Sequence, residues 1–126
     1  MSYSNVIIAG SRNFCDYKML EDRCQSVLAN WCAENGCDVQ IITGGARGAD
    51  ELGKRYAQEH QWEYQEFPAN WDLHGKAAGP IRNREMAKTA HVLIAFWDGR
   101  SRGTRNMINE ALHYGLDVHV YVQESD

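Results

Sequence analysis

The sequence predicts an α/β protein built on a doubly wound parallel sheet of five strands in the order 3-2-1-4-5. Two observations predict it. Short apolar runs alternate with stretches of helical spacing along the chain, and each of the main apolar runs ends at a loop rich in glycine or polar residues. The length of 126 residues, with 44% hydrophobic and 24% charged residues, is typical of one globular domain, so we expect residues 1–126 to form a single unit.

The first half of the chain is predicted to contain three strands and two helices. Leu20, Cys24 and Leu28 recur on one face of the first helix, for which Asp16 is the expected N-cap and Asn35-Gly36 the expected stop. The third strand is more polar than the first two, which places it at a sheet edge. These elements are a strand at 6–9, a helix at 16–35, a strand at 39–43, a helix at 47–60 and a strand at 63–67.

The second half is predicted to continue the same alternation after a loop. The strand that ends at Trp97 is the most apolar and is expected at the centre of the sheet. The last helix is expected to direct Met107, Ile108, Ala111 and Leu112 toward the core. The predicted elements are a loop at 68–80, a helix at 81–89, a strand at 91–97, a helix at 104–114 and a strand at 116–122.

Strands that alternate with helices form right-handed crossovers, so we expect a Rossmann-like parallel sheet covered on both faces. In such sheets, ligands bind at the carboxyl ends of the strands, where the strand order reverses. Here that point lies between the first and fourth strands. Four polar loops follow strands and are expected to meet at this rim, which favours a site for an anionic ligand.

The loop after the second strand, Gly44-Gly45-Ala46-Arg47-Gly48, is typical of a phosphate cradle. Glycines allow close approach of the backbone, the following helix directs N–H groups at an anion, and Arg47 supplies a guanidinium fork. The alternative is a tight turn with a solvated arginine. Asp50 could complement the dipole of that helix or pair with Arg47, which is at least as plausible as a ligand role.

The other loops supply further candidates. Gly103 and Thr104 open a helix and resemble a second phosphate cradle. Trp71 could stack on a base or lie at the surface, and His74 is more often solvated than catalytic. The candidate ligand-binding residues are Gly10, Ser11, Arg12, Gly44, Gly45, Arg47, Gly48, Trp71, Lys76, Arg82, Gly99, Ser101, Gly103 and Thr104.

Charge and cysteine content limit the function classes. A net charge of −4 disfavours non-specific duplex binding, although arginines concentrated in the second half keep nucleic acid as a candidate partner. The four cysteines form no C-x-x-C pair, which favours a reduced cytoplasmic compartment and argues against a metal site. We expect no cofactor, no membrane-spanning segment and no signal peptide.

Four segments carry a resemblance to a known family, and they occur in order over almost the whole chain. They resemble the signature of the YspA-type family in the SLOG superfamily of Rossmann-like nucleotide-binding proteins. The resemblance implies a nucleotide or a related sugar-phosphate ligand at the strand ends, bound by a sensing or binding module. The segments are residues 8–14 (IAGSRNF), 44–50 (GGARGAD), 75–86 (GKAAGPIRNREM) and 96–104 (FWDGRSRGT).

Two of these segments are also similar to the Lonely Guy phosphoribohydrolases, which release the base from nucleoside monophosphates. Residues 82–86 resemble their Arg-Lys-x-x-Met segment, and residues 100–107 resemble their Gly-Gly-x-Gly-Thr-x-x-Glu loop. The resemblance implies that Arg82 occupies the position of their catalytic arginine and that Gly103-Thr104 hold the phosphate. Their catalytic glutamate falls on Met107, which cannot act as a carboxylate base.

Two functions therefore remain open. One is nucleotide binding without chemistry. The other is an N-glycosidase that releases a base from a nucleotide or from nucleic acid, with Arg82 orienting the substrate and Glu85, Asp98 or Glu110 assisting water. Because the Lonely Guy proteins are dimers or larger, and because four tryptophans exceed the evident needs of a small core, we also expect a homo-oligomer.

Overall fold

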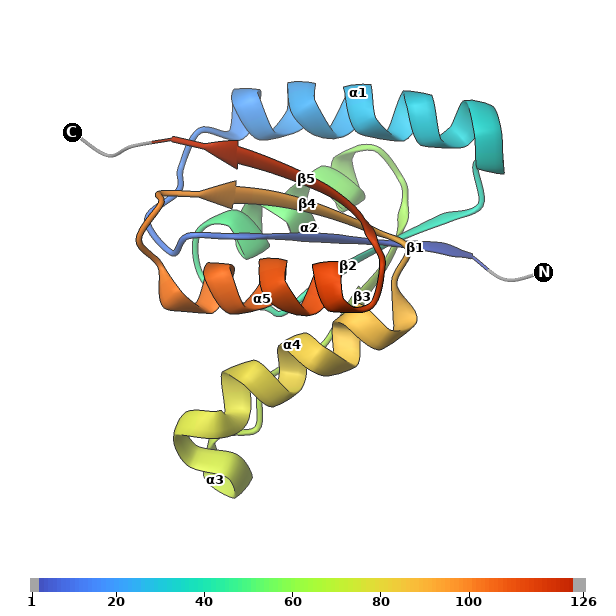
Figure 1. Cartoon of the computed structure of the whole chain (residues 1–126). Helices are drawn as coiled ribbons and strands as arrows, with labels where there is room; N and C mark the ends of the chain where they lie inside the picture. The colour runs from blue at the N-terminus through green and yellow to red at the C-terminus, as the bar shows by residue number, and fades with distance from the viewer. Residues whose placement is uncertain (1–2, 124–126) are drawn as a thin grey trace.

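The computed structural model describes residues 3–123 and shows a five-stranded parallel sheet in the order β3-β2-β1-β4-β5 (Figure 1). The predicted fold class and strand order are thus confirmed. The strands are β1 (Ser4–Gly10), β2 (Val39–Thr43), β3 (Glu63–Glu66), β4 (Val92–Trp97) and β5 (Asp117–Val122), and the main helices are α1 (Tyr17–Asn35), α2 (Ala49–Glu59), α4 (Ala78–Thr89) and α5 (Arg102–His113).

Two layers of helices cover the sheet, because successive strand residues point to opposite faces. Val6 and Ile8 of β1 pack on one face against α1 and α2, whereas Ile7 and Ala9 pack on the other against α4 and α5. The residues of β4 from Val92 to Phe96 are fully buried, as expected for a central strand. By contrast, β3 lies at an edge, as its polar composition predicted.

The ends of α1 follow the predicted signals. The Asp16 side chain accepts a hydrogen bond from the Met19 N–H at 3.1 Å, which satisfies one of the free donors of the first turn. At the other end, the Gly36 N–H donates to the Cys32 carbonyl at 2.9 Å. Asp16 as N-cap and the stop at Asn35-Gly36 are therefore confirmed.

Residues 68–80 differ from the predicted loop. They contain the short helix α3 (Trp71–His74) and the 3-10 turn η1 (Gly75–Ala77), and α4 begins at Ala78 rather than at residue 81. Asn70 caps α3 by accepting from the Leu73 N–H at 3.1 Å. Pro80 fits inside α4 because it lies in the first turn, where its missing N–H has no helical acceptor.

One expectation about a large apolar side chain was wrong. Leu112 is 59% exposed instead of facing the core, because α5 turns this face toward solvent beside β5. Two of the tryptophans are explained by the core, since Trp31 and Trp62 pack against it. Among the helices of residues 3–123, none is long and apolar enough to cross a membrane.

Candidate functional site

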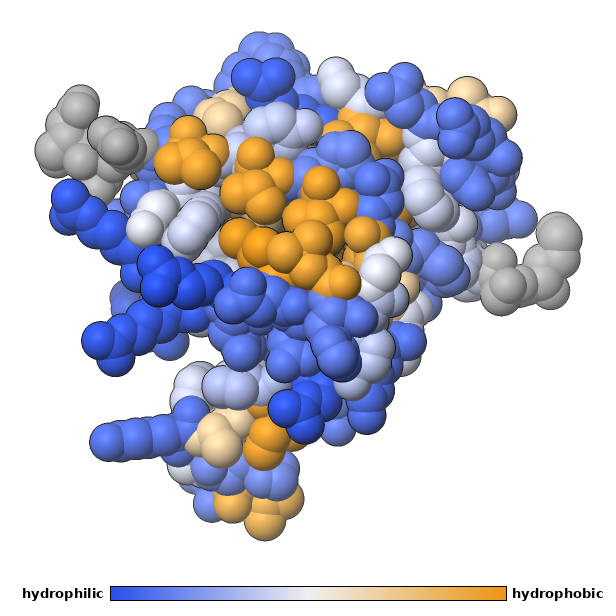
Figure 2. All heavy atoms as spheres, in the orientation of Figure 1, coloured by the Kyte–Doolittle hydropathy of each residue, from blue (hydrophilic) through white to orange (hydrophobic). Residues whose placement is uncertain are grey.

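A cavity of about 580 Å³ opens at the carboxyl ends of the central strands. Its wall includes Gly10 at the end of β1, Ala46 after β2 and Asp98 after β4, so three strand ends meet there. The first turn of α5 and the face of α4 complete the wall. Figure 2 shows a notch in the surface beside α5, with long hydrophilic side chains extending on both sides. The position agrees with the rim at which the sequence predicted an anion site.

Arg82 lines the cavity from α4 and is fixed by the backbone around it. Its Nη1 donates to the Gly44 carbonyl at 2.7 Å and to the Phe67 carbonyl at 3.4 Å, while its Nε donates to Asn83 Oδ1 at 2.9 Å. Burial lowers the pKa of this guanidinium, and the nearby Asp50 carboxylate opposes that shift. A guanidinium has five N–H groups, so donors remain for a ligand after these contacts.

Asp50, in the first turn of α2, places a carboxylate in the same cavity. It is only 6% exposed, and its Oδ2 accepts from the Ala46 N–H at 3.1 Å. Burial raises the pKa of Asp50 to about 6, although the Ala46 amide and the Arg82 charge favour its ionised form. The structure places Asp50 in the cavity wall, whereas the sequence made dipole complementation or a pair with Arg47 at least as plausible as a ligand role.

Arg102, Gly103 and Thr104 line the cavity from the first turn of α5. A cationic side chain, a helix N-terminus and a hydroxyl group thus gather at one place, which is an arrangement suited to a phosphate. A Cβ atom added at Gly103 would meet no atom within 4 Å, so the surface there is open to a ligand.

Asp98 holds the loop that leads into α5. Its Oδ1 accepts from the Arg100 N–H at 2.8 Å and from the Ser101 N–H at 2.7 Å, and these bonds lower the pKa of the carboxyl group. Ser11, which is buried, accepts from the Asp98 N–H at 3.0 Å through its Oγ. Asp98 lines the cavity, but its carboxylate is already occupied by the backbone of its own loop.

Asn83 and Met107 are wall residues from opposite helices. Asn83 Nδ2 donates to Asn106 Oδ1 at 2.9 Å and to the Gly103 carbonyl at 3.3 Å, which joins α4 to the start of α5. Met107 is buried and lines the cavity where the Lonely Guy resemblance places a glutamate. The wall is therefore apolar at that position.

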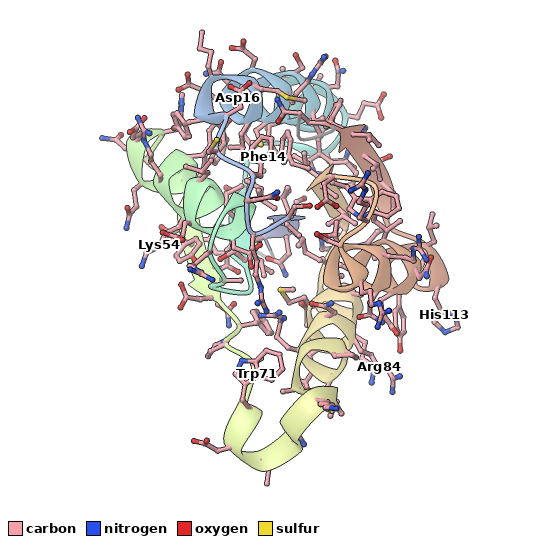
Figure 3. The ribbon with its side chains drawn as sticks, turned by 90° about the vertical axis from the view of Figure 1, so that its left-hand side faces the viewer. Phe14, Asp16, Lys54, Trp71, Arg84 and His113 are labelled. Atoms are coloured by element: carbon pink, nitrogen blue, oxygen red, sulfur yellow. The ribbon has the colours of Figure 1, made fainter. Side chains whose placement is uncertain are left out.

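Trp71, Lys76 and Arg12 line the outer part of the cavity and are all exposed. Trp71 is 53% exposed, and its ring lies 3.6 Å from the position of a Cβ built on Gly79. Figure 3 shows Trp71 beside α4, on the side opposite to Arg84. An exposed ring at the mouth of a polar cavity is suited to stacking on a base.

The glycines after β2 serve the packing of the loop itself. A Cβ at Gly44 would lie 2.2 Å from Arg82 Nη1, and one at Gly48 would lie 2.3 Å from the Ser11 carbonyl. Gly45 and Gly48 also have φ angles of 74° and 78°, which strain other residues. The absence of a side chain at Gly44 and Gly48 leaves room for Arg82 and for the loop after β1. A ligand role for Gly44, Gly45 and Gly48 remains a prediction.

Several predicted site residues lie outside the wall of this cavity. Glu110 lies 3.8 Å from Arg84, measured from Oε2 to Nε, and Glu85 is exposed on α4. The catalytic roles of Glu85 and Glu110 stay untested. Arg47 and Gly99 are exposed, and their ligand roles, like that of Ser11, also stay predictions. The predicted residues that do line the cavity are Gly10, Arg12, Trp71, Lys76, Arg82, Asp98, Ser101, Gly103 and Thr104.

The predicted ligand set omitted Asp50, Asn83 and Met86, all of which line the cavity. A signal was available for Asp50, because a carboxylate in the first turn of a helix that follows a glycine loop is directed toward the strand ends. Asn83 lies within the motif at residues 75–86, but its role in the wall could not be predicted, since its amide donates to groups 20 and 23 residues away in the sequence. No group of three or more His, Cys, Asp or Glu residues in 3–123 could hold a metal ion.

Comparisons with known proteins agree with this architecture. The model of the YspA, cpYpsA-related SLOG family matches residues 4–74. The Gene 61 protein of Mycobacterium phage D29 is 38% identical over 119 residues, which cover 90% of this chain and 92% of the phage protein.

Two solved structures share the fold. DNA processing protein A (DprA) from Streptococcus pneumoniae superposes with a TM-score of 0.72 at 19% identity, over 94% of this chain and 50% of that one, so this chain spans about half its length. TM1055 superposes with a TM-score of 0.61 at 17% identity, over 93% of this chain and 72% of that one. The family match extends over more than half of the sequence and includes the loops after β1 and β2, and the protein belongs to the YspA, cpYpsA-related SLOG family.

Proposed function

We propose that the protein binds a nucleotide or a related sugar phosphate in the cavity at the strand ends, as a sensing or binding module. The observation that carries the proposal is the first turn of α5, where Arg102, Gly103 and Thr104 face the same cavity as Arg82. The four cationic side chains in the wall, against two carboxylates, favour an anionic ligand. These cations are Arg12, Lys76, Arg82 and Arg102, and the carboxylates are Asp50 and Asp98.

Binding can be tested by calorimetry with the four common ribonucleoside monophosphates and with inorganic phosphate. Gly103→Val is the informative variant, because the added side chain meets no protein atom within 4 Å at its Cβ and would project into the space of the phosphate. We expect it to remain folded and to weaken binding at least tenfold. Ala33→Val, at an exposed position of α1, controls for a valine placed in a helix. Equal affinity of both variants would contradict the proposal.

An N-glycosidase is the second candidate function, and the observation in its favour is Arg82 in the cavity wall beside Asp50. Met107 supplies no carboxylate, and Asp98 is occupied by its own loop. Glu85 and Glu110 lie outside the wall, so Asp50 is the wall carboxylate left to activate the water, and Glu85 or Glu110 would have to reach the site from outside it. Base release from nucleoside monophosphates, and from normal and uracil-containing DNA, tests this candidate. Binding without base release would leave the sensing module as the function.

A further inference from the structure

Asp50, which is buried, and Arg82, which is half-buried, both line the cavity, and we call these two residues its polar floor. Asp50 is nine-tenths buried, and Arg82 is close enough to favour the ionised carboxylate. A carboxylate has about four acceptor positions. The backbone amides of Ala46 and Gly44 favour the charged form of Asp50. Together they would occupy only two of the roughly four acceptor positions, which leaves about two for a ligand. The floor therefore offers both acceptors and donors toward the cavity.

The charge of Asp50 determines which part of a ligand can lie against it. A phosphate at that position would face a like charge in a poorly hydrated place, which is costly. The cavity holds a better position for the phosphate at the first turn of α5. The group that faces Asp50 must instead donate hydrogen bonds, and a hydroxyl that also accepts from Arg82 satisfies both members of the pair.

Different parts of the cavity wall suit the base and the sugar of a nucleotide. Trp71, Pro80 and Met86 give one side of the cavity an apolar surface, which suits a base. The polar floor then remains for the sugar, whose vicinal hydroxyls carry two donors and several acceptors.

We propose that Asp50, together with Arg82, binds the ribose hydroxyls of the ligand, so that the site selects ribonucleotides over nucleotides that lack those hydroxyls. The inference rests on the proposed nucleotide-binding function and names the substrate class of the same cavity. A site built to accept hydrogen bonds from a hydroxyl discriminates strongly against an analogue without it, because its buried polar groups are then left unpaired.

The test compares each of the four ribonucleoside monophosphates with its 2′,3′-dideoxy counterpart by calorimetry at pH 7.5. We expect the wild-type protein to bind the ribonucleotide at least about tenfold more tightly. Asp50→Asn keeps the size and an oxygen acceptor for the Ala46 N–H but loses the charge, and we expect it to reduce the preference to less than about threefold. Asp38→Asn removes the same charge at an exposed position before β2 and should keep the full preference.

The outcomes separate the two proposals. Equal binding of ribonucleotide and dideoxynucleotide by the wild-type protein overturns the ribose inference and leaves the nucleotide-binding function intact. A full preference that survives in Asp50→Asn also overturns it. Failure of both compounds and of inorganic phosphate to bind at millimolar concentration overturns both proposals. The wild-type comparison needs no variant, so it can refute the selection of ribonucleotides even if Asp50→Asn does not fold.

Discussion

Arg82 donates from Nη1 to the Gly44 carbonyl oxygen at 2.7 Å, which joins α4 to the loop after β2 across 38 residues of sequence. Arg82 also lines the cavity wall, so the bond connects that wall to the loop after β2. A side chain at Gly44 would displace Arg82 and break this bond, since its Cβ would lie 2.2 Å from that nitrogen. One arginine thus shapes the loop and presents charge to a ligand.

The first prediction concerns this arginine. Arg82→Lys should lower the free energy of unfolding by about 1–3 kcal/mol, because the Gly44 and Phe67 carbonyls and Asn83 Oδ1 cannot all be reached by one ammonium group. It should also weaken nucleotide binding at least tenfold. Urea denaturation and calorimetry measure the two effects. Arg84→Lys, two residues along and exposed on the other side of α4, is the control, and equal behaviour of the two variants would contradict the prediction.

The second prediction concerns Asp98. Asp98→Ala should cost about 1–2 kcal/mol of stability, because the Arg100 and Ser101 amides lose their acceptor. The lowered pKa means that this contribution is present above the unfolded pKa of about 4 and is lost as the pH falls through the folded value. The difference in melting temperature between wild type and Asp98→Ala should therefore shrink at strongly acid pH. A difference independent of pH would contradict the assigned role.

The third prediction concerns the pH dependence of stability at Asp50. Because burial raises its folded pKa to about 6, above an unfolded value of about 4, the folded state holds this proton more tightly. The resulting stability is complete below pH 4 and is lost as the pH rises through 6. Arg82, Glu66 and the amides of Ala46 and Gly44 are the groups that act on this carboxyl group.

Asp50→Asn imitates the protonated side chain and has no such titration. Between pH 4 and pH 8, its free energy of unfolding should rise relative to wild type by about 2–3 kcal/mol, a change set by the pKa difference. Denaturation with urea at several pH values, without ligand, measures it. A constant difference across that range would show that Asp50 titrates normally.

The fourth prediction concerns assembly. The expected homo-oligomer is untested, and the surface offers a place for a second copy. Figure 2 shows an apolar patch over α5 and β5. β5 is also an edge strand, which presents unpaired backbone groups. The side chains in this region are Ile108, Leu112, Leu116, Val118, Val120 and Val122.

Light scattering at micromolar concentration should therefore give a multiple of the 14.3 kDa chain mass. Leu112→Glu should return the mass to that of one chain with little effect on unfolding, because Leu112 is 59% exposed. Lys18→Glu, at an exposed position on α1, is the control for an added acidic residue. A monomer mass for the wild-type protein would contradict the prediction.

The sequence was sufficient for the fold because its signals are local. The spacing of Leu20, Cys24 and Leu28, the cap at Asp16 and the apolar run of β4 each depend on a few neighbouring residues. The polar composition of β3 also sufficed to place it at an edge.

The site was predicted less fully because its contacts are distant in sequence. Asp98 could be assigned to the rim from its position after a strand, but not its engagement by the Arg100 and Ser101 amides. From the sequence, Asp50 was interpreted as a partner of the helix dipole or of Arg47 at least as readily as a ligand contact, because its burial depends on how α2 packs against the sheet. Leu112 was misplaced because helical spacing defines an apolar face without saying how much of it the sheet covers.

The hydroxyl of Ser11 accepts from the Asp98 N–H and lies 3.1 Å from Ser101 Oγ, while the Ser11 carbonyl accepts from the Ala49 N–H at 3.2 Å. This one residue therefore braces the loops after β2 and β4 against each other. Loops braced in this way are ordered before any ligand arrives, so little conformational entropy remains to be lost there on binding. By contrast, α3 projects beyond the sheet (Figure 1), and adaptation to ligands of different size would fall to Trp71 and Lys76.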